Sequence, residues 1–484
     1  MKRFLVLILA ITLVGQAWAA ETFTIGNFFY TVTDDVNNYV SVKAAVELTG
    51  DLVIPTTVEN RRITYTVTSI AENAFNGFTG LVSANIPETI KSIGSNAFRG
   101  CVGLVEVTIP NSVTSISSNA FTDCGYIETL TYNTNAVYRI FEGFTSLRTI
   151  NIGNAVTNIS NNAFNGCSSL TSITIGNSVE IIGERAFSGC IGLKSITIPN
   201  SVVSIGYAVF SGCSALNSIS LPFVGKSYCT QADDYYYTSD NFPDDDEYEG
   251  NYNLGYIFGH NNYTGGVEAK QYFIVKYPNS YSSSYYTKTI YRTYNIPSSL
   301  KEIIITGSSY IPYGAFSNCT RIKSITLPNT ITNIGQQAFS GCSGLTSITI
   351  GNSVISIGAK AFYNCSGLKS ITIPNSVKTI GNSTFYGCIG LLSISIPNNV
   401  TGINSSTFYN CNSLKSAIIP NSVTMIYDNA FYGCTNLMSV TIPNSVTSID
   451  VQAFYNCSNL KSVTIGNSVT SIAQNAFSNC RNLD

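Results

Sequence analysis

Charged residues are scarce in this chain, and histidine is almost absent. Lysine, arginine, aspartate and glutamate together make up 11% of the 484 residues, and His260 is the single histidine. The net charge of −2 argues against a nucleic-acid-binding surface or a basic membrane-binding patch. Hydrophobic residues make up 44% of the chain, which is too large a share for a disordered protein. The composition therefore predicts a folded protein with little electrostatic character.

The motifs of common catalytic and metal sites are also missing. A catalytic triad needs a base, and His260 stands alone among asparagines and glycines, as a solvated loop residue does. Residues 244–247 form one acidic run, but a glycosidase needs two carboxylates on opposite sides of a cleft, and a calcium loop starting at Asp245 has Tyr256 in place of its last glutamate. No glycine-rich phosphate loop and no C-x-x-C pair occurs. We therefore predict no enzymatic activity, no cofactor and no bound metal.

The N-terminus has the organisation of an export signal. Lys2 and Arg3 precede an apolar run from Phe4 to Val14, and Ala17-Trp18-Ala19 follows as a small-x-small cleavage pattern. We interpret residues 1–19 as a signal peptide. No later stretch of 18 or more apolar residues occurs, so the sequence predicts a secreted or cell-surface protein without a transmembrane segment.

What the chain has in abundance is repetition. Most of its cysteines recur every 23 residues, in groups that are separated by two gaps: Cys101, Cys124, Cys167, Cys190, Cys213, Cys319, Cys342, Cys365, Cys388, Cys411, Cys434, Cys457 and Cys480. Phe78 and Phe144 occupy the same position in two further copies. A fixed period of this length is typical of a solenoid, and the copies extend over residues 65–222 and 296–484.

One copy shows how a coil is expected to fold. Leu368, Ile371 and Ile373 follow an L-x-x-I-x-I spacing, so the isoleucines face one way and the intervening hydroxyls the other. Val377 and Ile380 then point inward again. No copy can bury its apolar face alone, but stacked copies can.

These spacings resemble the BspA-like leucine-rich-repeat family, whose 23-residue pattern is A-F-x-x-C-x-x-L-x-x-I-x-I-P-x-x-V. The resemblance extends over nearly the whole chain after the signal peptide. It implies a leucine-rich-repeat solenoid of β-dominated coils with short helical or irregular convex segments. Ser376 stands where the commonest leucine-rich repeats have a buried asparagine, so we expect a serine ladder to replace part of the asparagine ladder.

The repeated cysteines are predicted to form a reduced, buried column. Equivalent residues of stacked coils lie about 5 Å apart with parallel side chains, which rarely supplies the dihedral angle of a disulfide. Because Phe78 and Phe144 are accepted at the same position, it is a core position, where free cysteine behaves as a small hydrophobe. Cys229 is out of register and is the cysteine expected to be exposed or reactive.

Two segments at the ends of the array do not repeat in the same way. Residues 20–64 alternate as short strands, and we interpret them as an N-terminal β cap, as the resemblance also implies. After Leu483 no capping sequence follows. The last coil is therefore exposed, or it is a surface for self-association, or the chain continues beyond the sequence given.

Residues 223–295 form a tyrosine-rich insertion that holds half of the 30 tyrosines. Its tyrosines either pack on the edge of the solenoid, or they form a recognition loop, because tyrosine provides a large and stiff contact area. The candidate binding residues of this segment are Tyr235, Tyr236, Tyr237, Tyr285 and Tyr286.

The outward positions of the repeated strands give a second candidate surface. Ser370 and Thr372 belong to long columns of hydroxyl residues, and a partial lysine column beside them includes Lys369, Lys415 and Lys461. These columns are either the solubilising side of a half-buried sheet or a weak, multivalent contact surface.

The family resemblance implies surface or secreted proteins that attach to host tissue, matrix proteins or other microbes. The favoured hypothesis is an adhesin-like interaction protein whose partners are extracellular proteins or glycans and not nucleic acid. A structural or envelope-matrix scaffold component and a glycan-capture protein are the alternatives.

Overall fold

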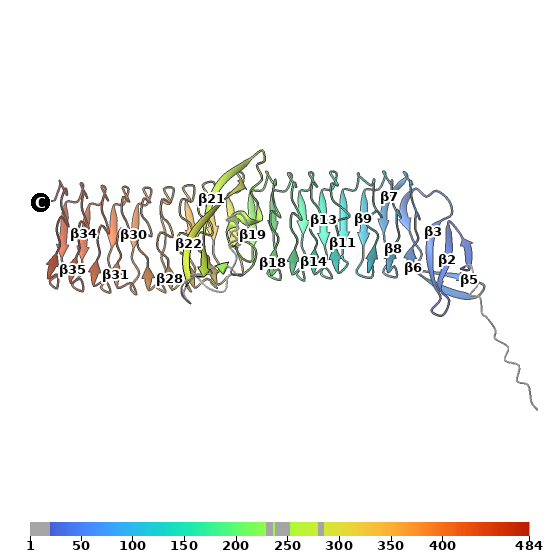
Figure 1. The fold of residues 1–484 in the computed structure, drawn as a ribbon, viewed down its shortest axis with the longest axis horizontal. Helices are drawn as coiled ribbons and strands as arrows, with labels where there is room; N and C mark the ends of the chain where they lie inside the picture. The colour runs from blue at the N-terminus through green and yellow to red at the C-terminus, as the bar shows by residue number, and fades with distance from the viewer. Residues whose placement is uncertain (1–19, 229–235, 238–251, 279–284, 484) are drawn as a thin grey trace, which may run out of the picture.

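The protein is a long solenoid that runs straight across Figure 1, from a small N-terminal unit to the last coil at the C-terminus. The computed structural model describes residues 20–228, 236–237, 252–278 and 285–483. The predicted signal peptide, Tyr235, Cys229 and the acidic run 244–247 lie outside these residues. Parallel coils of about 23 residues confirm the predicted solenoid of leucine-rich-repeat type.

Short parallel strands, which together we call the long-strand sheet, line one side of the described coils in four separately hydrogen-bonded groups. Its alternating pattern follows the L-x-x-I-x-I spacing, with isoleucines inward and hydroxyls outward. Successive strands pair in register, for example Ser195 with Ser218. Its strands are β4 (Gly50–Val53), β7 (Leu81–Asn85), β9 (Glu106–Ile109), β11 (Thr129–Tyr132), β13 (Thr149–Ile152), β15 (Ser172–Thr174), β17 (Ser195–Thr197), β19 (Ser218–Leu221), β23 (Glu302–Ile305), β25 (Ser324–Thr326), β27 (Ser347–Thr349), β30 (Ser393–Ser395), β32 (Ser416–Ile418), β34 (Ser439–Ile442) and β36 (Ser462–Ile465).

A second parallel sheet, the short-strand sheet, was not predicted. Each of its repeat strands holds two residues, and one of them points into the core, as Ile380 does. Two residues are too few to produce a recognisable alternation, although the inward direction of Val377 and Ile380 was predicted correctly. The repeat strands are β8 (Ser92–Ile93), β10 (Ser115–Ile116), β12 (Ala136–Val137), β14 (Asn158–Ile159), β16 (Ile181–Ile182), β18 (Ser204–Ile205), β24 (Tyr310–Ile311), β26 (Asn333–Ile334), β28 (Ser356–Ile357), β29 (Thr379–Ile380), β31 (Gly402–Ile403), β33 (Met425–Ile426), β35 (Ser448–Ile449) and β37 (Ser471–Ile472).

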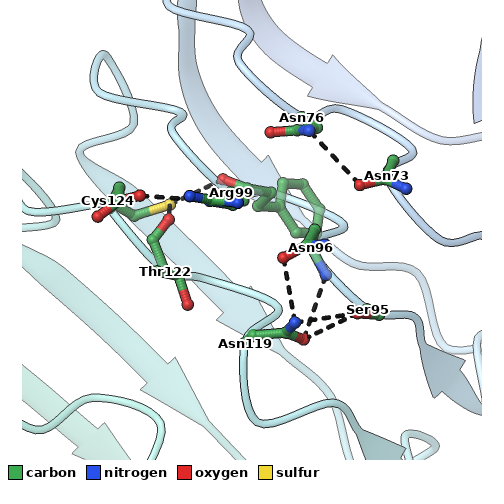
Figure 2. Close-up of polar contacts among 10 residues, drawn as sticks. Asn73, Asn76, Ser95, Asn96, Arg99, Asn119, Thr122 and Cys124 are labelled. Carbon is green, nitrogen blue, oxygen red and sulfur yellow. Dashed lines mark hydrogen bonds and ion pairs between the residues drawn. The ribbon is translucent and has the colours of Figure 1, made fainter.

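The third side of each coil, which we call the turn side, is irregular. Short helical or irregular segments were expected here, and the segments are irregular. In most coils two residues have backbone angles in the left-handed region. In one coil these are Asn96 (φ 54°) and Gly100 (φ 69°), and this conformation interrupts a right-handed helix. Figure 2 shows how side chains join neighbouring turns: the Asn119 amide donates to Ser95 Oγ at 3.0 Å and to Asn96 Oδ1 at 3.1 Å.

A column of phenylalanines fills the space between the turn side and the two sheets. One phenylalanine per coil is buried, and its ring stacks on the equivalent ring of the next coil. Phe385, for example, lies 5.4 Å from the ring centroid of Phe362 and 5.5 Å from that of Phe408, nearly parallel to both. Offset stacked rings contribute favourable energy beyond the area they bury. This column therefore couples each coil to its two neighbours.

The structure explains why nearly every coil carries a cysteine. The thirteen described cysteines are free, and all but Cys480 are buried, which confirms the predicted thiol column. Twelve thiols donate to the carbonyl of the phenylalanine 26 residues earlier, as Cys365 does to Phe339 O at 3.1 Å. Cysteine is thus a small hydrophobe with a weak donor directed at the preceding coil. Phe78 and Phe144, at the same position, are half-buried.

The serine ladder forms in part. Ser201 and Ser422 donate to carbonyl oxygens of the preceding coil, each at 2.7 Å. The buried hydroxyl oxygens of Ser112, Ser376 and Ser445 have no hydrogen-bond partner. Serine therefore replaces the asparagine ladder at some coils only.

At the N-terminus, antiparallel strands cover the first coil (Figure 1). The first three strands form an antiparallel meander, and the third pairs in parallel with β6, which in turn pairs with β8 of the short-strand sheet. Within residues 20–64, β4 already pairs with β7 of the long-strand sheet. The strands of this unit are β1 (Thr22–Ile25), β2 (Phe28–Asp34), β3 (Tyr39–Ala44), β5 (Thr57–Asn60) and β6 (Ile63–Ile70).

The tyrosine-rich insertion does not divide the solenoid. β19 and β23 pair directly in parallel, with Ser218 opposite Glu302. On the turn side, the one-turn 3-10 helix η1 (Leu254–Ile257) takes the place of a coil: Phe210 N–H donates to Ile257 O, and Leu254 N–H donates to Ala315 O. The rest of the described insertion is the antiparallel hairpin β21 (Gly266–Pro278) and β22 (Tyr285–Pro297), with β20 (Tyr236–Tyr237) beside β21.

Candidate functional site

The outward side of the long-strand sheet, which we call the strand face, carries the first candidate surface. Lys369, Ser370 and Thr372 are exposed there, and so are Lys415 and Lys461. Because most isoleucines of these coils point into the core, this face presents mainly lysines and hydroxyls to solvent, together with a few apolar side chains such as Ile418, which is 64% exposed. The predicted polar columns therefore lie on the same side of the solenoid.

Backbone hydrogen bonds set the order of the lysine column. Leu392 N–H donates to Lys369 O at 3.1 Å, and Lys415 N–H donates to Leu392 O at 2.9 Å. Met438 continues the column to Lys461 in the same way, with bonds of 3.3 and 2.9 Å. Lysines thus occupy every second coil, and exposed apolar side chains stand between them: Leu392 is 46% exposed and Met438 51%.

The electrostatics of this half of the array favour anions. Residues 320–484 contain eight lysines and arginines but three acids. Within the described ranges, the ion pairs formed by charged side chains all involve arginine, so none of them neutralises Lys369, Lys415 or Lys461. The lysine column is therefore a line of positive charges without acidic partners among the described residues.

The hairpin provides the second candidate surface. Lys270 lies over the ring of Tyr291, with Nζ 3.5 Å from the centroid, and the Tyr272 ring contacts Tyr291 edge-on. Tyr291 is 51% exposed, so this cation–π cluster lies at the surface. In contrast, Tyr256 and Tyr294 are buried against the array. Some of the described tyrosines of the insertion thus pack against the array, and others are exposed at the surface.

The tyrosines singled out in the sequence belong to the strands of this hairpin sheet, apart from Tyr235, which lies outside the described residues. Tyr236 and Tyr237 form β20 and pair with Val275 and Lys276 of β21. Tyr285 and Tyr286 begin β22, opposite Pro278 and Tyr277. The backbone therefore places these four tyrosines at one end of the same three-stranded sheet.

Two buried amides attach the insertion to the array. Gln271 is fully buried; its Oε1 accepts from Gly255 N–H at 2.7 Å, and its Nε2 donates to Ser317 O at 3.3 Å. Asn253 Nδ2 donates to Gly314 O at 2.9 Å. Because a buried amide gains stability when its donors and acceptor are paired, Gln271 holds the hairpin against η1 and the array, whereas Asn253 is paired through Nδ2 and its Oδ1 is buried without a partner.

Replacing Gln271 by leucine is expected to loosen the insertion without unfolding the solenoid. The change leaves Gly255 N–H and the carbonyl of Ser317 unpaired, which costs on the order of 1–3 kcal/mol for each buried group. Hydrogen exchange followed by mass spectrometry should show faster exchange in residues 252–275 and unchanged exchange in the other coils. Glu268→Gln, an exposed change on the same strand, is the control. If both variants exchange as slowly as the unmodified protein in residues 252–275, this role of Gln271 is contradicted.

The prediction that His260 is a solvated loop residue is confirmed, and the structure adds a contact that was not predicted. Its side chain is exposed, as expected of a loop residue, but its ring Nδ1 is hydrogen-bonded to the Tyr207 hydroxyl, and its backbone N–H donates to the same oxygen at 3.0 Å. The residue thus joins the end of η1 to the array. Non-local contact with a residue 53 positions away left no signal in the sequence around His260.

Sequence reasoning missed a stack of tyrosines on the turn side. Five half-buried rings, one from each of five successive coils, stack with centroid distances of 4.4–4.9 Å: Tyr363, Tyr386, Tyr409, Tyr432 and Tyr455. The recurrence of tyrosine directly after the core phenylalanine was the available signal. Because each ring covers the next, the stack presents ring edges to solvent and supports coil packing.

Two further observations concern metals and membranes. Among the residues that the structure describes, no group of three or more histidine, cysteine, aspartate and glutamate side chains is placed to hold a metal ion. No helix in the described ranges is long and apolar enough to cross a membrane.

Stacked parallel coils with a polar strand face and a phenylalanine core define a leucine-rich-repeat type of solenoid. A sequence profile of the BspA type leucine rich repeat region matches residues 55–142, 138–237, 288–415 and 355–484. These matches include more than half of the chain, and the protein belongs to this family. No curated protein matches the chain.

Several solved structures are similar to the protein. A leucine-rich repeat protein from Bacteroides ovatus is 25% identical, with 96% of this chain and 93% of that chain covered and a TM-score of 0.41. A leucine rich cell surface protein from Faecalibacterium prausnitzii is 24% identical, with 92% and 94% covered and a TM-score of 0.35. The pneumococcal vaccine antigen PcpA is 19% identical, with 94% and 99% covered and a TM-score of 0.30. The family assignment rests on the profile and the repeat, not on these overall superpositions.

Proposed function

We propose that the protein is a secreted or cell-surface interaction protein of adhesin-like function, which binds host or microbial surface proteins or glycans. The observation that carries this proposal is the strand face, which repeats exposed hydroxyls from coil to coil and exposed lysines on every second coil, in a solenoid that also carries a tyrosine-bearing hairpin. Repeated equivalent contacts raise the overall affinity without a single strong site. The family and the predicted signal peptide support a location outside the cytoplasm.

The absence of a catalytic motif in the sequence agrees with a binding role. The proposal uses two surfaces: the strand face with Lys369, Ser370 and Thr372, and the hairpin with its exposed Tyr291. Aromatic side chains of this kind contribute large contact areas at interfaces, whereas the lysines contribute long-range attraction.

An envelope-matrix or scaffold role by self-association is the second candidate. Glycan capture is the third candidate, and it uses the same strand face as the first.

The test separates the hairpin from the strand face. Removing residues 223–295 altogether would also remove Leu254 and Tyr294, which fill the array, so a smaller change is needed. Val275 and Lys288 are opposite each other in the hairpin, and an Asn-Gly turn between them can replace residues 276–287. Biolayer interferometry would compare this variant with the protein without its signal peptide, on matrix proteins, mucins and glycans.

We expect the unmodified protein to bind at least one class of these ligands. Loss of binding in the shortened variant would assign recognition to the end of the hairpin that carries Tyr285 and Tyr286. A second variant, Tyr291→Ala, tests the cation–π cluster that the shortened hairpin keeps. Binding that both variants retain would assign recognition to the strand face. Circular dichroism must show the same β-content in both proteins. The adhesin-like function is contradicted by a folded protein that binds nothing on the panel, and concentration-dependent oligomers in analytical ultracentrifugation would then favour the scaffold role.

A further inference from the structure

The lysine column has a period of two coils, and the turn side has the same period. Coils with asparagine before the core cysteine, such as those of Asn364 and Asn410, carry lysine on the strand face. Coils with glycine there carry an uncharged residue instead: Thr346 in the coil of Gly341, Leu392 in that of Gly387 and Met438 in that of Gly433. The repeating unit of this part of the chain is therefore a pair of coils, not a single coil.

Packing on the turn side holds the two kinds of coil in alternation. A Cβ atom added at Gly387 would lie 2.1 Å from Asn364 Oδ1, and one added at Gly433 would lie 2.2 Å from Asn410 Oδ1. The asparagine side chain thus occupies the space that a glycine leaves in the next coil. Each coil contributes one turn-side residue and one strand-face residue. The alternation of asparagine and glycine on the turn side is therefore accompanied by the alternation of lysine and uncharged residues on the strand face.

The period sets the distance between the positive charges. Neighbouring strands lie about 4.8 Å apart, so lysines on every second coil lie about 9.6 Å apart along the solenoid axis. Lys369, Lys415 and Lys461 form the continuous part of this line, and Lys323 lies one further period before them. Exposed Leu392 and Met438 separate the charges.

This spacing selects among the linear polyanions. In duplex DNA the phosphates of one strand follow each other at about 3.4 Å along the helix axis, so lysines spaced by two coils cannot contact successive phosphates one by one. A peptide cannot extend the long-strand sheet from its face, because the backbone groups of these coils already bond to neighbouring coils. Two sugar rings in an extended chain match the two-coil distance, and Ser370 and Thr372 can hydrogen-bond sugar hydroxyls.

We propose that the strand face of residues 320–465 binds a linear acidic polysaccharide with one anionic group per disaccharide, which lies along the solenoid axis. Each lysine pairs with one anionic group, and Leu392 and Met438 pack against the apolar faces of the rings between them. This inference rests on the proposed binding function and names the ligand class for the strand face.

The test uses hyaluronan, which carries one carboxylate per disaccharide, and polygalacturonate, which carries one per sugar. The decisive variant exchanges two neighbours in the column, Leu392→Lys with Lys415→Leu. It keeps the composition and net charge but breaks the spacing. A second variant replaces Lys369, Lys415 and Lys461 by glutamine. Its matched control, Lys360→Gln with Lys378→Gln and Arg481→Gln, removes the same charge from exposed residues outside the column.

We expect both column variants to bind hyaluronan at least about tenfold more weakly, whereas the control stays within about twofold of the unmodified protein. Unmodified protein should prefer hyaluronan to polygalacturonate, polyglutamate and single-stranded oligothymidine. The inference is overturned if the exchanged variant binds as well as the unmodified protein, if the control loses as much affinity as the column variants, or if polygalacturonate, polyglutamate or oligothymidine is preferred to hyaluronan. Binding to matrix proteins in those cases would leave the proposed function intact, whereas no binding to any ligand would remove both.

Discussion

Raising the pH from 8 to 11 is expected to unfold the solenoid, because burial keeps its thiols protonated. Burial raises the pKa of Cys167, Cys213, Cys342 and Cys388 from 9.0 to about 12. A pKa that is higher in the folded state gives stability that is complete below the unfolded pKa, near 9, and is lost as the pH rises towards 12. At pH 10.5 each of these thiols costs about 2 kcal/mol, so that four of them approach the total stability of an ordinary domain.

Urea unfolding followed by circular dichroism at several pH values would measure this loss. Cys388→Ala removes one titrating group, so its free energy of unfolding should fall by about 2 kcal/mol less between pH 8 and 10.5 than that of the unmodified protein. Ser347→Ala, at an exposed position without a titrating group, is the control and should show the full loss. An identical pH dependence in all three proteins would mean that the thiols do not limit alkaline stability.

Replacing Phe385 by alanine is expected to cost about 3–5 kcal/mol and to divide the array into two unfolding units. The ring is fully buried between Phe362 and Phe408, so its removal leaves a cavity and interrupts the phenylalanine stack. Each coil contacts only its neighbours. The cavity should therefore reduce the coupling energy between the two halves of the array more than it reduces the stability of either half. Denaturant unfolding should therefore show two transitions in the variant.

Two further variants serve as comparisons for the size of this effect. Phe385→Leu keeps most of the buried volume and should cost less than half as much as alanine. Tyr126→Ala removes a ring that is 63% exposed and should change the free energy of unfolding by no more than about 0.5 kcal/mol. A Phe385→Ala protein with a single transition and a loss below 1 kcal/mol would show that the stack does not couple the coils.

The candidate surfaces differ in how far the sequence predicted them. The lysine column was visible because Lys369, Lys415 and Lys461 recur at fixed spacing, and a solenoid places such residues on one face. The hairpin cluster of Lys270, Tyr272 and Tyr291 was not visible, since these residues do not repeat and meet only through the pairing of β21 with β22.

The sequence by itself determined the coil, its core and its thiol column, because a 23-residue period repeats the same short-range pattern of inward and outward residues in every copy. The tertiary structure alone decided the short-strand sheet, whose two-residue strands are defined only by their neighbours. It also decided that β19 and β23 pair across the insertion while η1 fills the missing turn. These features depend on contacts between residues far apart in the chain, such as Gln271 with Ser317, and a local pattern carries no record of them.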